Sequence, residues 1–396
     1  MDKKTNNWKT KKLGEVVDVF DNLRKPINLT ERLKRINGKK TKDLFPYYGA
    51  TGQVGWIDSY LTEGEFILVG EDGAPFLDNY KSKAYKIFGK TWVNNHAHIL
   101  KEKENLTLNS FILYYLNSID YRQYVNGTTR LKLTKGSLLD IPFPLPPLET
   151  QHAIVSKIEE LFSELDKGIA ELKTAQKQLK TYRQSVLKFA FEGKLTNENV
   201  KEGELPDGWE RKTFNDVIDI SKEKYKPNNS ESKFYVGLEH IEKNLGVLTA
   251  ECGFENIKTI KNKFNVGEIL YGKLRPYLNK VYLAKENGVC STDILVLKTK
   301  KNCNAQFLTH LMLGVDFVNT MSENTSGVNL PRVSTKFILE YPINLPPIEE
   351  QNRIVQEIES RLSVADKMEQ SIQESLQKAE ALRQSILKKA FCGELV

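Results

Sequence analysis

The sequence repeats itself at an offset of 200 residues, and this repeat limits what the chain can fold into. Residues 145–195 align with residues 345–395 without a gap, and 21 of the 51 positions are identical. A weaker similarity lies upstream, where WKTKKLGEVVDV from Trp8 resembles WERKTFNDVIDI from Trp209. A repeat of this length indicates that one structural unit is built twice. Each half is a variable block of about 140 residues followed by a similar block of about 50.

The two similar blocks predict long helices. Each block opens with a Pro-Pro pair and has no later proline, while Gly193 and Gly393 are placed to end the helices. Apolar residues recur at alternating spacings of four and three, which is typical of a coiled-coil seam. Helices of roughly 36–40 residues are expected. The predicted seam residues are Ile154, Ile158, Leu161, Leu165, Leu172, Leu179, Val186, Ile354, Ile358, Leu362, Ile372, Leu382 and Ile386.

Two amphipathic helices of equal length in one chain most simply pack antiparallel, related by a pseudo-twofold axis. Unrelated core helices, or helices that pair between chains, are the alternatives. The two helical blocks have the same length, which favours a spacer of fixed length. We also expect the two chain ends to lie near each other. The expected domains are 1–143 and 208–343, with helices in 144–195 and 344–396 and a linker at 196–207.

The variable blocks predict mixed α/β domains, so the expected fold is α/β (mixed α+β) with two globular domains separated by the helices. Strand-like runs bounded by turn residues occupy 15–20, 65–70, 97–101, 216–221, 268–274, 280–285 and 293–298. Helical patterns occupy 110–125 and 305–321.

The charge distribution indicates a polyanion as partner. The chain has a net charge of +7, and residues 1–143 alone have a balance of +7 while residues 208–343 have +4. No apolar run is long enough to span a membrane and no secretory signal opens the chain. The four cysteines lie far apart, which argues against a disulfide scaffold and a structural zinc site. A cytoplasmic location is expected.

Catalytic motifs are absent from the sequence. It contains no GxxxxGK[ST] loop, no GxSxG, no HExxH and no methyltransferase motif of the FxGxG and [NDS]PP[YF] type. Glu192-Gly193-Lys194 resembles the end of a nuclease motif, but the second copy has Cys392-Gly393-Glu394 instead. His96 and His98 could share one face of a strand, yet no third metal ligand accompanies them. We therefore expect no catalytic residue and no metal site in this chain.

Cations, aromatic residues and turn residues gather in loops of both variable blocks, a pattern that suits DNA binding. Lysines and arginines can neutralise phosphates, and polar side chains can contact base edges. Solvated loops of an α/β fold are the alternative. Arg130 and Arg275 are the expected base readers, because a guanidinium pairs with guanine through two hydrogen bonds. The predicted DNA contacts are Tyr48, Gly49, Thr51, Gln53, Thr128, Thr129, Arg130, Lys132, Lys135, Glu239, His240, Lys273, Arg275, Tyr277, Lys280, Arg332 and Lys336.

The whole chain resembles the DNA-specificity subunits of type I restriction-modification enzymes. The specific part of the resemblance is LPPLETQ and LPPIEEQ opening the helices, and RQSVLKFAFEGKL and RQSILKKAFCGEL closing them. GEILYGKLRPYLNKV, CSTDILVL, YYGATGQVGWIDSY, EFILVGEDG and WVNNHAHIL are also similar to patterns of target-recognition domains.

The resemblance implies that each target-recognition domain reads one half of a bipartite site in double-stranded DNA. It also implies that the helices set the spacer and dock two modification (methyltransferase) subunits, which bind S-adenosylmethionine and methylate adenine. Two restriction subunits could join and use ATP and Mg for translocation and cleavage, so no cofactor is expected in this chain. A nuclease fused to a recognition unit, a stand-alone DNA-binding protein and a coiled-coil adaptor outside a restriction system are the alternatives.

Overall fold

The computed structural model describes residues 8–197, 200–201, 203–227 and 232–396. The predicted linker 196–207 therefore lies partly outside the described residues. Among the helices that are described, none is long and apolar enough to cross a membrane.

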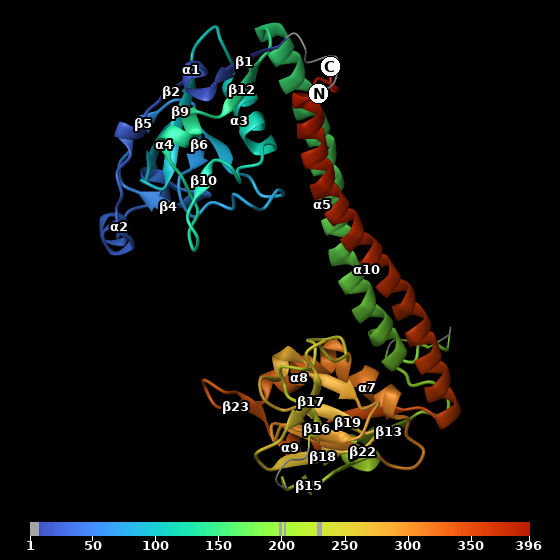
Figure 1. Ribbon diagram of the computed structural model, residues 1–396. Helices are drawn as coiled ribbons and strands as arrows, with labels where there is room; N and C mark the ends of the chain where they lie inside the picture. Colours follow the sequence, from blue (N-terminus) through green and yellow to red (C-terminus); the bar gives the residue numbers. More distant parts are fainter. Residues whose placement is uncertain (1–7, 198–199, 202, 228–231) are drawn as a thin grey trace. The chain divides into compact units, whose positions relative to one another are not determined.

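The internal contacts divide the chain into two units. The first consists of the chain up to Lys173 together with Gln373–Val396, and the second is Thr174–Ile372. Each unit holds one mixed α/β domain and part of both long helices, α5 (Leu148–Phe191) and α10 (Ile348–Phe391) (Figure 1). The expected fold class, with two repeated domains and two long helices, is confirmed.

The domain of the first unit is built on two four-stranded sheets. One has the strand order β2-β9-β6-β7 and is antiparallel, and α3 packs against β6, β7 and β9. The other has the order β4-β3-β8-β5, with β3 and β8 parallel. The strands are β1 (Lys9–Lys12), β2 (Val17–Val19), β3 (Phe45–Gly49), β4 (Gly52–Ile57), β5 (Thr62–Glu63), β6 (Phe66–Gly70), β7 (Ala84–Ile87), β8 (Lys90–Val93), β9 (Ala97–Glu102), β10 (Val125–Asn126), β11 (Lys132–Leu133) and β12 (Pro142–Leu145). The helices are α1 (Leu13–Val16), η2 (Asp21–Leu23), α2 (Leu29–Ile36), η3 (Thr41–Asp43), α3 (Asn109–Ser118) and α4 (Lys135–Leu139).

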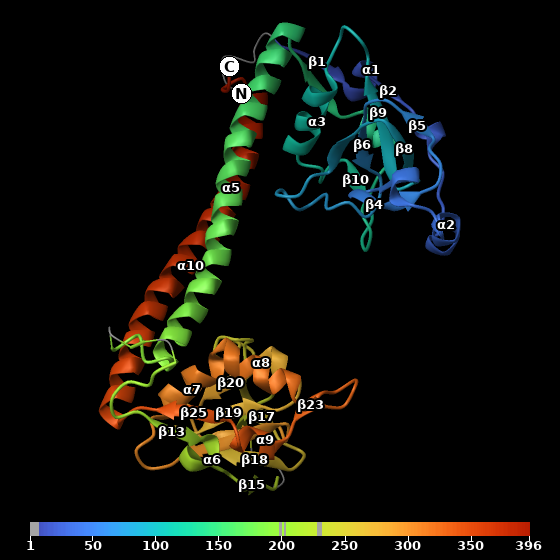
Figure 2. The ribbon, with the colours of Figure 1, turned by 180° about the vertical axis from the view of Figure 1, so that it is seen from behind.

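The domain of the second unit repeats this plan (Figure 2). Its four-stranded sheet has the order β14-β22-β19-β20, and its second sheet has five strands in the order β15-β18-β21-β16-β17. The strands are β13 (Glu210–Thr213), β14 (Ile218–Ile220), β15 (Lys224–Tyr225), β16 (Ser232–Val236), β17 (Gly253–Asn256), β18 (Lys261–Phe264), β19 (Ile269–Gly272), β20 (Val281–Leu283), β21 (Gly288–Cys290), β22 (Ile294–Thr299), β23 (Thr325–Ser326), β24 (Arg332–Val333) and β25 (Pro342–Leu345). The helices are α6 (Phe214–Val217), η4 (Pro276–Leu278), α7 (Ala305–Leu313), α8 (Val315–Glu323) and α9 (Thr335–Leu339).

In each domain, the first strand pairs with the last strand. β1 pairs with β12 so that Lys9 faces Leu145, and β13 pairs with β25 so that Glu210 faces Leu345. Trp8 and Leu395 border the same core in the first unit, as expected for chain ends that lie near each other.

The predicted strands at 15–20 and 216–221 begin later than expected, because one helical turn precedes each of them. The Glu15 carboxylate accepts a hydrogen bond from the Lys12 amide at 2.8 Å, and Asp216 accepts one from the Thr213 amide at 2.7 Å. An acidic side chain at the third helical position satisfies an amide that the first turn leaves unpaired. This local bond outweighs the strand-like pattern.

Both long helices have 44 residues, more than the expected 36–40, because they begin directly after the Pro-Pro pairs. Each ends on a glycine with positive φ, Gly193 at +78° and Gly393 at +75°. The amide of Lys194 donates to the carbonyl of Phe189 at 2.9 Å, which caps the helix as a Schellman motif does.

The two long helices run antiparallel within each unit. In the first unit, Ile154 and Ile158 from the start of α5 share a buried cluster with Ile386 near the end of α10. In the second unit, Ile354 and Ile358 share one with Val186. Interhelical ion pairs occur at equivalent positions of the repeat: Arg183 with Asp366 at 2.7 Å, and Arg383 with Asp166.

The seam prediction is wrong at Leu382, whose side chain is 50% exposed. The next residue, Arg383, packs across the seam instead, with its guanidinium 4.4 Å from the ring centre of Phe162. An α-helix has 3.6 residues per turn, so a strict heptad stripe rotates around it and the packed face moves to the adjacent column. The remaining seam residues are buried or half-buried.

Candidate nucleic-acid interface

In both units, a short hairpin is bound to the loop that follows one central strand of the four-stranded sheet. In the first unit, the Leu133 amide of β11 donates to the Glu71 carbonyl, just after β6, at 2.7 Å. In the second unit, the Val333 amide of β24 donates to the Lys273 carbonyl, just after β19, at 3.1 Å. The same contact thus brings two sequence-distant candidate segments together in each domain.

The turn of each hairpin requires glycine. Gly127 has φ of +115°, and a Cβ there would lie 2.4 Å from the carbonyl oxygen of Arg130. Gly327 has φ of +96°, with the Leu330 carbonyl 3.1 Å from such a Cβ. The turn therefore stays tight and presents the residues after the glycine to solvent.

The predicted contacts on the first hairpin lie on its surface. Thr128, Thr129, Arg130 and Lys135 are exposed. The Arg130 guanidinium forms an ion pair with Asp72 through Nη2, which leaves its other N–H groups to donate elsewhere. The Lys132 ammonium lies 3.0 Å from a carboxylate oxygen of Glu71.

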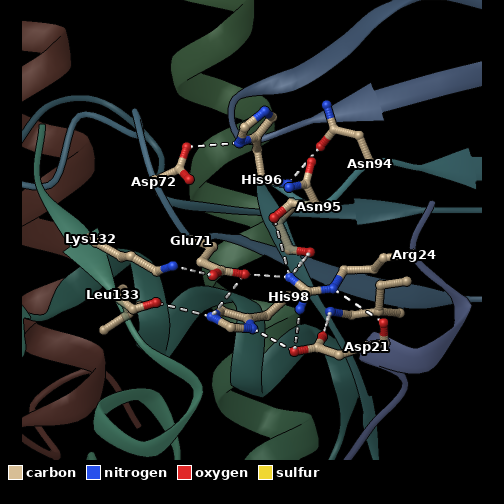
Figure 3. Close-up of polar contacts among 12 residues, drawn as sticks. Asp21, Arg24, Glu71, Asp72, Asn94, Asn95, His96, His98, Lys132 and Leu133 are labelled. Carbon is tan, nitrogen blue, oxygen red and sulfur yellow. Dashed lines mark hydrogen bonds and ion pairs between the residues drawn. The ribbon is translucent and has the colours of Figure 1, made fainter. Parts of the chain in front are cut away.

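A buried ionic network lies behind this hairpin (Figure 3). Arg24 forms ion pairs with Asp21, at 3.1 Å, and with Glu71. His98, 1% exposed, has Nδ1 2.7 Å from Asp21 and Nε2 3.0 Å from the carbonyl oxygen of Leu133. Since a carbonyl oxygen only accepts, Nε2 carries a proton and donates to the hairpin strand.

The charges of this network favour ionised carboxylates. Burial alone would raise the pKa of Asp21, but hydrogen bonds from His98 and the Ile99 amide, with the charge of Arg24, lower it below the usual value. Burial likewise opposes ionisation of Glu71, and hydrogen bonds from Arg24 and Lys132 lower its pKa.

His96 and His98 have structural partners, as the sequence suggests. The Nδ1 atom of His96 lies 2.8 Å from Asp72, and His98 belongs to the buried network. Among the described residues, no group of three metal-binding side chains occurs.

The β3–β4 hairpin contains both exposed and interior candidates. Thr51 and Gln53 are exposed. Gly49 is buried and its carbonyl accepts from the Tyr85 hydroxyl, so it has no free surface for DNA. Tyr48 is half-buried against the Tyr85 ring at 5.9 Å, and burial raises the pKa of its hydroxyl.

Arg275 is the best-placed candidate of the second unit. It is exposed, has φ of +52°, and its amide donates to the carbonyl of Pro331 in the hairpin at 2.7 Å. Left-handed backbone at a non-glycine residue is strained and concentrates at functional sites. Within the described part of the chain, no ion pair or hydrogen bond of its guanidinium is found. Tyr277 beside it is 49% exposed.

The other candidates of the second unit divide into exposed and constrained side chains. Lys336 and Glu239 are exposed, and Lys273 is half-buried. Arg332 is held by Asp293, with Nε–Oδ1 at 3.0 Å and Nη2–Oδ2 at 3.2 Å.

His240 and Lys280 are predicted DNA contacts whose side chains also make bonds within the domain. His240 is 7% exposed and accepts a hydrogen bond from the Gly237 amide at 3.1 Å. The ammonium of Lys280 donates to the carbonyl of Ile241. Both side chains close loops of the domain, a role that their residue type does not reveal.

Sequence reasoning missed three features of this surface. Val328, at the second hairpin tip, is an apolar residue that is 99% exposed. The partners Asp21 and Arg24 are brought to His98 only by the tertiary fold. A basic run at 24–43 could have been found from its local charge.

The comparison with protein families identifies the kind of chain this is. The sequence model described as "Type I restriction modification DNA specificity domain" matches residues 5–174 and 206–378. The chain belongs to this family. The two matches each cover one domain and the beginning of the helix that follows it, so the family unit is the repeat seen in the sequence.

Individual relatives span nearly the whole chain. The type I restriction enzyme EcoDI specificity subunit of Escherichia coli is 28% identical over 98% of this chain and 89% of its own length. The MjaVIII specificity subunit of Methanocaldococcus jannaschii is 22% identical over 89% of this chain and 86% of its own.

Solved structures show the same fold. A chain from a study of complex assembly and conformational transition of the type I restriction-modification system has a TM-score of 0.71, with 17% identity and both chains fully covered. The HsdS subunit from Thermoanaerobacter tengcongensis has a TM-score of 0.56, with 17% identity, and covers 98% of this chain and 97% of its own.

Proposed function

We propose that this chain provides the DNA sequence specificity of a type I restriction-modification enzyme, with each domain reading one half of a bipartite site in double-stranded DNA. The observation that carries the proposal is the hairpin-and-loop surface present in both domains with different exposed side chains. One tip presents Thr128, Thr129 and Arg130, and the other presents Val328, Asn329 and Leu330. Two equivalent surfaces with unlike chemistry suit two unlike half-sites.

The proposed contact residues are the exposed members of the predicted set. In the first domain they are Thr51, Gln53, Thr128, Thr129, Arg130, Lys132 and Lys135. In the second they are Glu239, Arg275, Tyr277 and Lys336, with Lys273 and Arg332 shaping the loop.

The long helices are proposed to set the spacer and to dock two modification subunits, while restriction subunits can complete the enzyme. Their equal length supports the first role. Exposed apolar residues support the second, since Tyr182 and Phe189 on α5 and Val364 and Met368 on α10 are each more than 40% exposed. Such side chains on a charged helix pair suit a protein surface.

The chemistry of the enzyme is proposed to reside in the partners. S-adenosylmethionine would be bound by modification subunits that methylate adenine, and ATP and Mg by restriction subunits. This chain would position those partners on DNA and contribute no reacting group.

Sequencing methylated adenines tests the proposal. The chain is co-expressed with its modification subunits in a host without other adenine methylation, and the modified positions are mapped. We expect one asymmetric bipartite motif with a fixed spacer. Methylation without a motif, or no change in methylation together with binding of other proteins through the helices, would favour a stand-alone DNA-binding protein or an adaptor.

A further inference from the structure

Most of the net positive charge of this chain lies in one short stretch. Residues 24–43 contain eight lysines and arginines against two acidic residues, a balance of +6 in a chain whose total is +7. The stretch lies between β2 and β3, where 25 residues intervene. The equivalent connection of the second domain, between β14 and β16, has 11 residues and a balance of +1. The charge therefore belongs to an extension of the first domain.

Arginines fix this extension to the domain. Arg32 donates to the Val54 carbonyl of β4 at 3.0 Å, and its guanidinium lies 4.7 Å from the ring centre of Tyr47. Arg35 donates to Asp58 at 2.7 Å and lies 5.1 Å from the ring of Trp92. Planar guanidinium groups combine ion pairing with stacking on aromatic rings, so α2 is held to the domain along one side.

Lysines occupy the side of the extension that faces solvent. Lys34, Lys40 and Lys42 are exposed, and within the described ranges none of them forms an ion pair or hydrogen bond. Lys39 differs, because it lies 2.8 Å from Asp58 and helps to lower the pKa of that carboxyl. Three flexible ammonium groups are thus left without counter-charges on a rigidly held support.

α2, which carries Lys34, lies along β4, the strand that follows the turn with the proposed contact Thr51. Arg32 is bonded to Val54 near the start of this strand, and Arg35 is bonded to Asp58 just past its end. The chain then continues through Lys40 and Lys42 to Phe45, which pairs with Ile57 at the end of β4 away from Thr51. Figures 1 and 2 both show α2 and the β10 hairpin at one end of the first domain, with β1 at the other. A duplex bound at the hairpin would extend past α2.

We propose that α2 and η3 form a phosphate-binding arm, in which Lys34, Lys40 and Lys42 neutralise the DNA backbone flanking the first half-site. The inference rests on the proposed function. Unpaired lysines suit phosphates because they act as point charges without the directional pattern that base reading requires. The arm contributes affinity that is independent of base sequence, and it does so in one domain only.

The same helix carries two exposed leucines, Leu29 at 60% and Leu33 at 53%, which suit a protein partner instead. At 100° per residue they point to a different side of α2 from Lys34. The charge of the stretch and its place beside the hairpin favour DNA, and the leucines provide the contrasting variant for the test.

The test measures DNA affinity against salt concentration for the complex with its modification subunits. The variant carries Lys34→Gln, Lys40→Gln and Lys42→Gln. The control carries Lys9→Gln, Lys11→Gln and Lys12→Gln on β1, with the same loss of charge and the added loss of the Lys11–Glu15 and Lys12–Asp140 ion pairs. Each phosphate contact contributes about 0.9 to the slope of log affinity against log salt. We expect the arm variant to lower the slope by up to about 2.7 on target and non-target DNA alike. The control should leave it unchanged, and both variants should methylate the same motif.

A slope unchanged in the arm variant, or lowered equally by the control, would overturn the arm. Loss of complex assembly in Leu29→Ser with Leu33→Ser, combined with an unchanged slope in the lysine variant, would assign α2 to a protein partner. Failure of the proposed function has a separate signature, because the wild-type complex would then bind target and non-target DNA with equal affinity. Unchanged melting temperatures establish that the variants are folded, since the substituted lysines of the arm have no partners to lose.

Discussion

At the scale of single residues, the two domains differ in how their basic side chains are held. Arg130 is paired with Asp72, and Arg332 with Asp293, whereas the guanidinium of Arg275 has no partner in the described part of the chain. A paired arginine has part of its N–H donors engaged, whereas an unpaired one has all of them available to a base. Arg275 is therefore the residue from which the largest sequence-specific effect is expected.

Replacing Arg275 with alanine should weaken binding to the native second half-site by about 1–3 kcal/mol and relax the motif at one position there. The first half-site should keep its full preference. The measurement is a competition series with each base of both half-sites substituted in turn. Lys336→Ala is the control, because an exposed lysine on α9 should reduce affinity for all DNAs alike. Equal losses on matched and mismatched DNA would remove Arg275 from the base-reading residues.

The residue types in the sequence predicted where the cationic side chains lie, but not which of these side chains lack a partner within the domain. His240 and Lys280 are residue types that can contact DNA. In this domain, however, His240 accepts a hydrogen bond from a backbone amide and Lys280 donates one to a backbone carbonyl. Those backbone groups belong to loops whose course depends on the tertiary fold. Val328 shows the reverse case, because an apolar residue after the turn glycine is exposed by a hairpin that the local sequence did not identify.

At the scale of elements, the repeated LPPxExQ motif is explained by its glutamine. Gln151 is fully buried, donates to the carbonyls of Leu106 and Pro146 and accepts from Thr107 and the Leu108 amide. Gln351 is also fully buried and makes three of these bonds in the second unit, donating to the carbonyls of Asn302 and Pro346 and accepting from the Asn304 amide. The motif thus binds the first turn of α5 to the loop before α3, and the first turn of α10 to the loop before α7. The sequence revealed that the motif repeats, but the partners of the glutamine lie about 45 residues away.

Gln151→Ala should lower the free energy of unfolding by about 1–3 kcal/mol, because two carbonyls, an amide and a hydroxyl lose their buried partner. Denaturant unfolding of the full chain measures the loss. Gln178→Ala is the control, since Gln178 is exposed on the same helix and should change stability by less than about 0.5 kcal/mol. Equal stability of the two variants would mean that water replaces the glutamine without cost.

The ionic network behind the first hairpin should make that hairpin sensitive to acid. Asp21 and Glu71 have pKa values lowered by their partners in the folded state, and these partners are lost on unfolding. Their contribution is therefore complete above the pKa values of the unfolded chain and disappears as pH falls below about 4. Hydrogen exchange of residues 125–133 should show easier opening of the hairpin through this range.

Asp21→Asn should open the hairpin more readily at neutral pH and weaken its dependence on acid. Asp18→Asn is the matched control, because Asp18 is exposed on β2 and no ion pair is found for it in the described ranges. If Asp21→Asn retained the acid dependence of the wild type, other carboxylates would have to hold the hairpin.

At the scale of the whole molecule, the repeat is preserved where length matters and varies where DNA is read. Both helices have 44 residues, and the ion pairs of Arg183 and Arg383 fall at equivalent positions. The sequence predicted these helices well, because their periodicity is a local property of the chain. It predicted the seam less well at Leu382, because the packed face depends on how two helices rotate against each other.

A spacer of fixed length makes a quantitative prediction. Inserting seven residues after Ala175 and seven after Ser375 keeps the two copies equal and lengthens each helix by about 10 Å, which corresponds to about three base pairs. A heptad also nearly preserves the rotational phase of the seam. The methylated motif of the complex should keep both half-sites and gain about three base pairs between them. Insertion in α5 alone is the control, since it displaces Arg183 and the residues after it relative to α10 and should abolish the complex. A double insertion that left the spacer unchanged would show that the separation of the half-sites is set by the partner subunits and not by these helices.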